Sequence, residues 1–310
     1  MILAISHAED EHAAAVLGAL RRLGAEAALV DLADFPARAR LSFDAGPGAG
    51  DALLEGPGWR LRARDVSAVW WRRPRPPTPD PMLSAADAAF AFRQSESAFL
   101  GVTAALRVLW VNDPWRDAAA SHKPLQLAAA QRVGLEVPAT LVTNDPARAR
   151  AFLDARGAAP SVHKALHATA RDWRLTRLVG PADRERLDAV RLAPVVLQEY
   201  VPGVDVRVTA VGRRLFAAEI DARDTASPED FRPVVAAARV GRCRLPAAVA
   251  RRLRALVSTL GLSFAAIDLR RRDDGEHVFL EVNPSGQWNF VEERAGLPIT
   301  DAVAALLAGG

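Results

Sequence analysis

The sequence predicts an α/β protein built of several lobes, and three observations lead to this fold class. The chain opens as strand, helix and strand: the apolar run MILAIS precedes apolar residues at helical spacing from Glu11 to Leu23, and Gly24 separates this helix from AEAALVDL. Later segments continue to alternate short apolar runs with helical patterns. Finally, 310 residues with 50% hydrophobic composition suffice for two or three packed cores.

The first lobe is predicted to end near residue 118. After a Gly- and Pro-rich stretch, WRLRARDVSAVWWRRP is expected to be one extended segment, closed by the prolines from Pro74 to Pro81. An alanine-rich helix at about residues 85–106 and the strand RVLWVN follow. The loop DPWRDAAASHKP then leads into the next lobe.

The rest of the chain is predicted to form two further lobes. The first begins with the helix PLQLAAAQRV, the strand ATLVT and a helix that Asn144 or Asp145 caps, with Pro146 in its first turn. The strand PSVHKALH, the charged helix PADRERLDAVRL and the buried strand PVVLQEYV come next. The last third contains the strands VRVTAVG and RLFAAEI, the helix AAVARRLRALVSTL, a hairpin and a closing helix from Pro298.

Charge and cysteine content exclude several classes of protein. The formal charge is only +3, and the arginines are scattered among acids, so nucleic-acid binding is not expected. A single cysteine, Cys243, excludes an internal disulfide. The N-terminus lacks the basic flank of a signal peptide, and no apolar run is long enough for a membrane span. The sequence therefore predicts a cytoplasmic protein with no membrane segment.

Lysine is rare in this chain. Of 40 Lys and Arg residues, only Lys123 and Lys164 are lysines. An arginine bias leaves lysine by chance or where a compact ammonium group is needed, and such a group suits phosphate oxygens in a narrow site where a planar guanidinium does not fit.

The hairpin FAAIDLRRRDDGEHVFLEVNPSGQW carries the strongest local signal. An Asp274–Gly275 type I′ turn sets Asp268 directly opposite Glu281, with Cβ atoms about 5 Å apart. Asn283 shares the face of Glu281, because side chains alternate along a strand. These oxygens suit Mg²⁺. The alternative is a pair of opposed surface charges, and a register slip of one residue would turn Asp268 to the other face.

Several motifs resemble those of ATP-grasp enzymes: AVWWRRP, WVNDPWRDAAASHKPLQLAAAQRVGLEVPATLVTND, QEYV followed by DVRVTAVG, and FLEVNPSGQW with GLPITDAVAALL. More narrowly, they resemble the macrocyclases and related maturases that make microviridins and other graspetides. The resemblance implies an ATP-grasp fold with a Rossmann-like pre-ATP-grasp domain at residues 1–118, a central lobe at 119–197 and a C-terminal lobe at 198–310. ATP would be clamped between antiparallel sheets of the two lobes.

The resemblance also implies roles for individual residues. For ATP binding these are Lys123, Lys164, Gln198, Glu199, Tyr200, Val201 and Asp205. For catalysis they are Arg207, Lys164 and Arg270, and for metal binding Asp268, Glu281 and Asn283. The cofactors would be ATP and Mg²⁺, with two ions. Trp288 would cap the cleft or fill the core, Arg72 and Arg73 would be a first-lobe signature or a structural feature, and Asp230 to Arg232 would match a DWR-like element of the central region.

Three functions remain open at this point. The first is a ligase that acts through an acyl phosphate and is a possible homodimer. It would form ester or amide crosslinks within a ribosomal precursor peptide made of a leader and an acidic core. The second is a RimK-like ligase that adds amino acids to a protein or a small acid, against which NPSGQW and WWRRP argue. The third is an inactive relative that binds peptides, against which the retained lysines and metal ligands argue.

Overall fold

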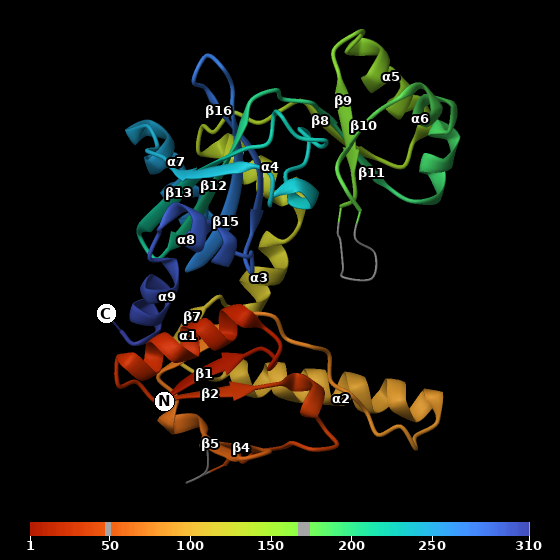
Figure 1. The fold of residues 1–310 in the computed structure, drawn as a ribbon. Helices are drawn as coiled ribbons and strands as arrows, with labels where there is room; N and C mark the ends of the chain where they lie inside the picture. Colours follow the sequence, from red (N-terminus) through yellow and green to blue (C-terminus); the bar gives the residue numbers. More distant parts are fainter. Residues whose placement is uncertain (47–50, 167–173, 310) are drawn as a thin grey trace. The chain divides into compact units, whose positions relative to one another are not determined.

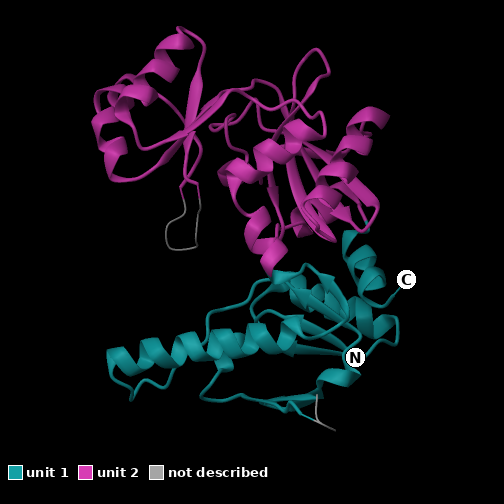
Figure 2. Cartoon of the chain, turned by 180° about the vertical axis from the view of Figure 1, so that it is seen from behind, with its two compact units in different colours: residues 1–114, 298–310 teal, residues 115–297 magenta. Residues whose placement is uncertain are grey.

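The computed structural model describes residues 1–46, 51–166 and 174–309, and the chain divides into two compact units (Figure 2). Unit 1 contains residues 1–114 and 298–310, and unit 2 contains residues 115–297. The three-part division at residues 118 and 197 stays a prediction.

Unit 1 is built on a parallel sheet with the strand order β2-β1-β6-β7. Its strands are β1 (Ile2–Ile5), β2 (Ala27–Val30), β6 (Ala68–Trp71) and β7 (Leu109–Val111). Its helices are α1 (Glu11–Arg22), α2 (Ala85–Ala104) and α9 (Ile299–Leu307). All four residues of β1 are buried, as expected for a central parallel strand, and Asp10 caps α1 by accepting a hydrogen bond from His12 N.

The predicted single extended segment at WRLRARDVSAVWWRRP is wrong. The structure divides it into β5 (Trp59–Arg62), a 3-10 turn at Ala63–Asp65 and β6. β5 joins β3 (Arg40–Phe43) and β4 (Ala52–Gly56) in a separate antiparallel sheet. The residue pattern explains the division, because only Leu61 is buried in β5, whereas three of the four residues of β6 are buried.

The last helix of the chain packs in unit 1. α9 lies beside α1 (Figure 1). Arg22 of α1 pairs with Asp301 of α9 at 3.0 Å. The sequence division instead ran the C-terminal lobe to residue 310. Helix periodicity predicts an apolar face on α9 but not the element that covers it.

Unit 2 contains two antiparallel sheets. The first has the order β10-β9-β11-β8, and its strands are β8 (Thr140–Thr143), β9 (Ser161–Lys164), β10 (Arg177–Leu178) and β11 (Val195–Glu199). The second has the order β14-β13-β12-β15-β16, and its strands are β12 (Val204–Val211), β13 (Arg214–Asp221), β14 (Arg239–Arg242), β15 (Phe264–Arg271) and β16 (His277–Asn283). Antiparallel sheets therefore form both halves of unit 2, as predicted.

The helices of unit 2 confirm most of the predicted pattern, but the loop predicted at DPWRDAAASHKP is wrong, since Pro114–Ala120 is helical, and no helix was predicted at Asn289–Ala295. They are α3 (Pro114–Ala120), α4 (Lys123–Arg132), α5 (Pro146–Ala155), α6 (Pro181–Glu185), α7 (Ala247–Thr259) and α8 (Asn289–Ala295). Asp145, rather than Asn144, caps α5. The charged helix predicted at 181–192 is shorter, since a 3-10 turn replaces it after Glu185.

The core of the five-stranded sheet supports the site described next. Every residue of β12 is buried, and apolar side chains of β12 and β15 pack with those of α4 and α7. Among the described residues, no helix has the length and apolar character needed to span a membrane.

Candidate functional site

The hairpin of β15 and β16 places Asp268 directly opposite Glu281, so this predicted pairing is confirmed. The predicted two-residue turn is wrong. Arg272 N donates to Glu276 O, and Gly275, with φ at 90°, donates to Arg272 O, so three residues form the turn. This shifts the register by one residue near the turn. A β-bulge between Asp268 and Leu269 shifts it back, because it leaves one residue of β16 without a cross-strand partner.

A pocket in unit 2 brings together residues from several elements. Its volume is about 80 Å³. It is lined by the predicted site residues Lys123, Lys164, Asp205, Asp268 and Glu281, together with Thr176, Glu229, Asp230, Phe231, Arg232 and Leu280. Both lysines of the chain therefore face the same pocket as the carboxylates of the hairpin.

Lys123 forms a direct hydrogen bond to Glu281, and both side chains are largely buried. Burial by itself raises the pKa of Glu281. The ammonium groups of Lys123 and Lys164 outweigh this effect and lower the pKa from 4.5 to about 2. Glu281 is thus held as a carboxylate.

Lys164 is the last residue of β9 and also lines the pocket. Burial lowers its pKa from 10.5 to about 8, and the charge of Lys123 adds to this effect, whereas Glu281 opposes it. Such an ammonium group lacks full solvation and gains most from an added anion.

Arg207 and Asp268 face each other across β12 and β15. The Nη1 atom of Arg207 lies 2.7 Å from both carboxylate oxygens, and its Nη2 donates to Gln287 O at 3.0 Å. Burial raises the pKa of Asp268, and Glu281 raises it further, while Arg207 opposes both. Two neighbouring carboxylates in a buried pocket favour a bound cation.

The donor set fits Mg²⁺ in chemistry. Asp268 and Glu281 supply carboxylate oxygens, and Asn283 supplies an amide whose nitrogen lies 3.4 Å from Glu281 Oε1. Among the described residues, no group of three His, Cys, Asp or Glu side chains could hold a metal. Asn283 would supply the third ligand through its amide oxygen, which the other orientation of the amide group would turn toward Glu281. Its role stays a prediction.

Arg270 is bonded on all sides and does not line the pocket. It donates to Val201 O at 3.0 Å, to Asp205 at 2.6 Å and to Pro228 O at 2.9 Å. Burial raises the pKa of Asp205 to about 7, despite the nearby Arg270. These contacts favour a structural role for Arg270, and its predicted catalytic role stays untested.

The predicted adenine strand runs from Gln198 to Val201. The buried Gln198 donates to Thr140 Oγ1 at 2.8 Å. Glu199 accepts from Ala139 N at 3.2 Å and lies 3.5 Å from Arg156, and the ring of Tyr200 faces the Arg270 guanidinium at 5.7 Å. These contacts link β11 and the residues after it to neighbouring elements. The predicted binding of adenine by these residues stays a prediction.

The structure adds Arg232 to the site. Asp230, which is buried, accepts from Arg232 Nε at 2.7 Å and from Thr176 N at 3.1 Å, and so holds the guanidinium at the pocket. The sequence signal was the match of residues 230–232 to a DWR-like element. Trp288 is fully buried against Phe264 at 5.1 Å between ring centroids, so it fills the core.

The first-lobe arginines and a second pocket belong to unit 1. Arg72 is buried, with its Nε 3.3 Å from Asp10.

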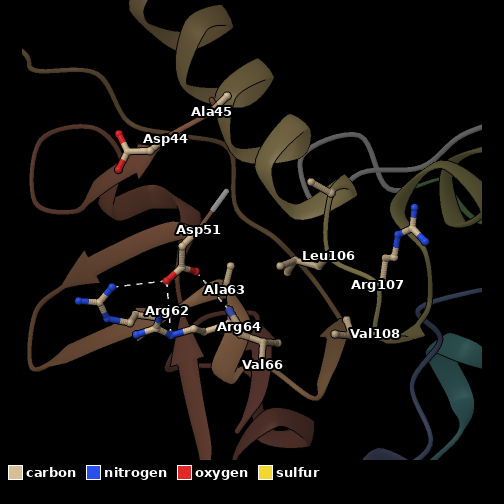
Figure 3. A pocket seen from close by; sticks show the side chains of 11 residues that line it. Asp44, Ala45, Asp51, Arg62, Ala63, Arg64, Val66, Leu106, Arg107 and Val108 are labelled. Atoms are coloured by element: carbon tan, nitrogen blue, oxygen red, sulfur yellow. Dashed lines mark hydrogen bonds and ion pairs between the residues drawn. The ribbon is translucent and has the colours of Figure 1, made fainter. Parts of the chain in front are cut away.

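A pocket of about 980 Å³ lies between β4–β5 and the end of α2 (Figure 3), and its Asp51 pairs with Arg62 and Arg64 at 3.4 and 3.6 Å. None of the predicted site residues lines this pocket.

The first 118 residues match the family model of the MvdD pre-ATP grasp domain. The whole chain is similar in structure to the macrocyclase MdnC bound with the precursor peptide MdnA from Microcystis aeruginosa MRC. The identity is 26% and the TM-score 0.89, and the match covers 100% of this chain and 99% of MdnC.

Two other proteins are also similar. The ATP-grasp ligase PsnB, complexed with a minimal precursor, Mg and ADP, matches at 25% identity and a TM-score of 0.79, over 99% of this chain and 96% of PsnB. A probable alpha-L-glutamate ligase of Citrobacter koseri is 30% identical over 185 residues, which is 57% of this chain. The match spans only 59% of that curated relative.

Proposed function

Because the chain belongs to the ATP-grasp superfamily, we propose that it is an ATP-dependent ligase that activates a carboxylate as an acyl phosphate and joins it to an amine or a hydroxyl group. One observation carries the proposal: Lys123 and Lys164 face the paired carboxylates Asp268 and Glu281 in one pocket. Anionic and cationic groups of this kind match the charges of a metal–nucleotide complex.

Each residue has a distinct part in this proposal. Lys123 and Lys164 bind phosphate oxygens, and Asp268, Glu281 and Asn283 hold Mg²⁺. A bound Mg²⁺ neutralises charge on the phosphates. Arg207 and Arg232 orient the anionic group that is transferred, because each guanidinium is fixed by a carboxylate at the pocket. Lys123 now contacts Glu281, so the phosphates of a bound nucleotide would compete with this carboxylate for its ammonium group.

The proposed substrate is a ribosomal precursor peptide whose acidic side chains become linked to amines or hydroxyls of the same peptide. The similarity to MdnC and PsnB, both bound to precursors, supports this substrate. A leader and an acidic core in the peptide, two Mg²⁺ ions and a homodimer are finer parts of the proposal.

The test uses the full chain with ATP, Mg²⁺ and a short acidic peptide encoded beside its gene. Mass spectrometry is expected to show a product lighter by one water per crosslink. Glu281→Gln should abolish this loss, whereas Glu276→Gln, at an exposed position of the same hairpin, should preserve it. An unchanged peptide with the wild-type chain, or full activity in Glu281→Gln, would refute the proposal.

A second candidate is addition of glutamate to an acceptor, which the similarity to the probable alpha-L-glutamate ligase supports. The same experiment distinguishes the two functions. Supplying free glutamate would then give a product heavier than the acceptor by a glutamyl residue, instead of a peptide lighter by water.

A further inference from the structure

Gln126 is a polar residue in the core beneath the site. It lies on α4 and is only 3% exposed, next to the buried Ala129 and Ala130. A buried carboxamide is costly unless its groups are hydrogen-bonded. An apolar side chain would suit this position equally well if packing were the only requirement.

The carboxamide of Gln126 bonds both backbone groups of one residue in β16. Its Nε2 donates to Val282 O at 2.8 Å, and its Oε1 accepts from Val282 N at 3.1 Å. β16 is an edge strand, with β15 on its other side. The side chain therefore takes the place of a neighbouring strand at Val282, since no other strand of the described ranges pairs with this edge there.

Val282 lies between two of the proposed metal ligands, Glu281 and Asn283. Its own side chain packs in the core, so the flanking side chains turn to the opposite face. Fixing the backbone of Val282 thus fixes the height and direction of Glu281 relative to Asp268. Leu280, the residue that the β-bulge leaves unpaired, lies two residues away on the same strand, where register is most easily lost.

The same carboxamide also anchors the segment that carries Lys123. Nε2 of Gln126 donates to Ala120 O at 2.7 Å, at the end of α3. Lys123 lies between these two residues in sequence, and its ammonium group contacts Glu281. One side chain therefore links α3, the first turn of α4 and the metal strand.

We propose that Gln126 is a positioning residue of the nucleotide and metal site, which holds Glu281 in register with Asp268 and within reach of Lys123. This inference rests on the proposed function. Gln126 does not line the pocket and acts through Val282 and Ala120. Gln126 would act like a residue that does not bind the metal itself but hydrogen-bonds a metal ligand and so orients it. Loss of such a residue weakens metal affinity about tenfold to a hundredfold.

The test replaces Gln126 with Glu and measures binding of ADP with Mg²⁺ by calorimetry across pH. An ionised carboxylate keeps the acceptor for Val282 N but faces the carbonyls of Val282 and Ala120 without a donor. Burial raises the pKa of such a carboxyl group, so affinity should fall at least about tenfold at alkaline pH, where the group is ionised. Protonation at lower pH restores a donor and should recover much of the loss. The charged groups on the three connected elements are Arg116, Asp117, Lys123, Arg132, His277 and Glu281.

Gln131→Glu is the matched control, because it makes the same change at an exposed position of the same helix. Titration of the other groups affects both variants equally. Gln126→Met keeps the volume but has no hydrogen-bonding group, and it should weaken binding at every pH without recovery. Hydrogen exchange at the Val282 amide should rise in Gln126→Met, which has no oxygen to accept from this amide, and stay unchanged in the control.

The outcomes separate the two proposals. If the wild-type chain binds no ADP with Mg²⁺, the proposed function and this inference both fall. If it binds, and both Gln126 variants match Gln131→Glu in affinity at every pH, only the positioning role is overturned. A Gln126→Glu variant that does not fold leaves the decision to Gln126→Met, whose unchanged affinity would equally overturn the role.

Discussion

Replacing Lys123 with Met should strengthen the binding of a free divalent cation while weakening the binding of nucleotide. In the structure the Lys123 ammonium group donates a hydrogen bond to the Glu281 carboxylate, so a divalent cation that binds there without nucleotide must displace this ammonium group. The pKa of Glu281 falls from 4.5 to about 2 in this environment, a net effect of about 3 kcal/mol that the surrounding positive charge produces against the opposing cost of burial.

Lys164 shares this effect with Lys123, so about 3 kcal/mol gives the scale of the Lys123 contribution rather than a bound on it. Removing Lys123 should therefore raise the affinity for the free cation by on the order of a hundredfold. Nucleotide affinity should fall in the same variant, because one of the two ammonium groups for the phosphates is gone. Glu281 would then select metal and nucleotide together in the wild-type chain, since only the phosphates draw Lys123 away.

The assay is titration with Mn²⁺ without nucleotide, followed by paramagnetic resonance of the free ion, and then the same titration with ADP. Arg132→Met serves as the control, because it removes a positive charge from the other end of α4. Equal Mn²⁺ affinities for Lys123→Met, Arg132→Met and the wild-type chain, without nucleotide, would refute the reasoning.

Three further predictions concern pH and backbone geometry. Lys164 has a pKa of about 8 without nucleotide, and phosphates favour its charged form. Nucleotide binding should therefore take up a proton and weaken as pH rises above 8. Calorimetry in buffers of different ionisation enthalpy measures this uptake, and binding without any proton uptake would contradict the prediction. The pKa of Asp205 is raised from 3.8 to about 7, so between these pH values the folded state binds more protons than the unfolded state. The protonated carboxyl group therefore stabilises the fold fully below pH 3.8, and this contribution of up to about 4 kcal/mol is lost as pH rises through 7. Asp205→Asn should remove this decline in the free energy of unfolding, measured by denaturation at several pH values, and an unchanged dependence on pH would contradict it. Gly203→Ala should lower the free energy of unfolding by about 2 kcal/mol or more, because φ is 140° and a Cβ would lie 2.1 Å from Arg271 O. Gly241→Ala is the control and should change it by less than about 0.5 kcal/mol, since no neighbouring atom lies within 4 Å of the added Cβ. Equal unfolding midpoints for the two variants would contradict this prediction.

The position of Asp268 opposite Glu281 shows how sequence and structure each contributed. The sequence predicted the right partners from a two-residue turn, whereas the structure has a three-residue turn and a compensating bulge. Alternation of apolar residues indicates strands and a hairpin, but a bulge moves the register by one residue with little trace in the pattern. The correct pairing therefore arose from two departures that cancel.

The sequence by itself determined the order of most helices and strands, a cap before α5 at Asn144 or Asp145, and the rarity of lysine. These features depend on neighbouring residues, whose spacing and chemistry are visible in the chain. The assignment of Lys123 and Lys164 to one site relied on resemblance, because no local pattern relates residues so far apart in sequence.

Only the tertiary structure decided which groups meet. Lys123 reaches Glu281 across 158 positions of sequence, and Gln126 bonds the backbone of Val282 across 156. The enclosed environment then sets the pKa of each charged group, because desolvation and nearby charges exist only once the strands and α4 have packed together. A polar residue such as Gln126 looks like an ordinary helix former in the sequence, and its role becomes visible only when the edge strand it bonds is in place.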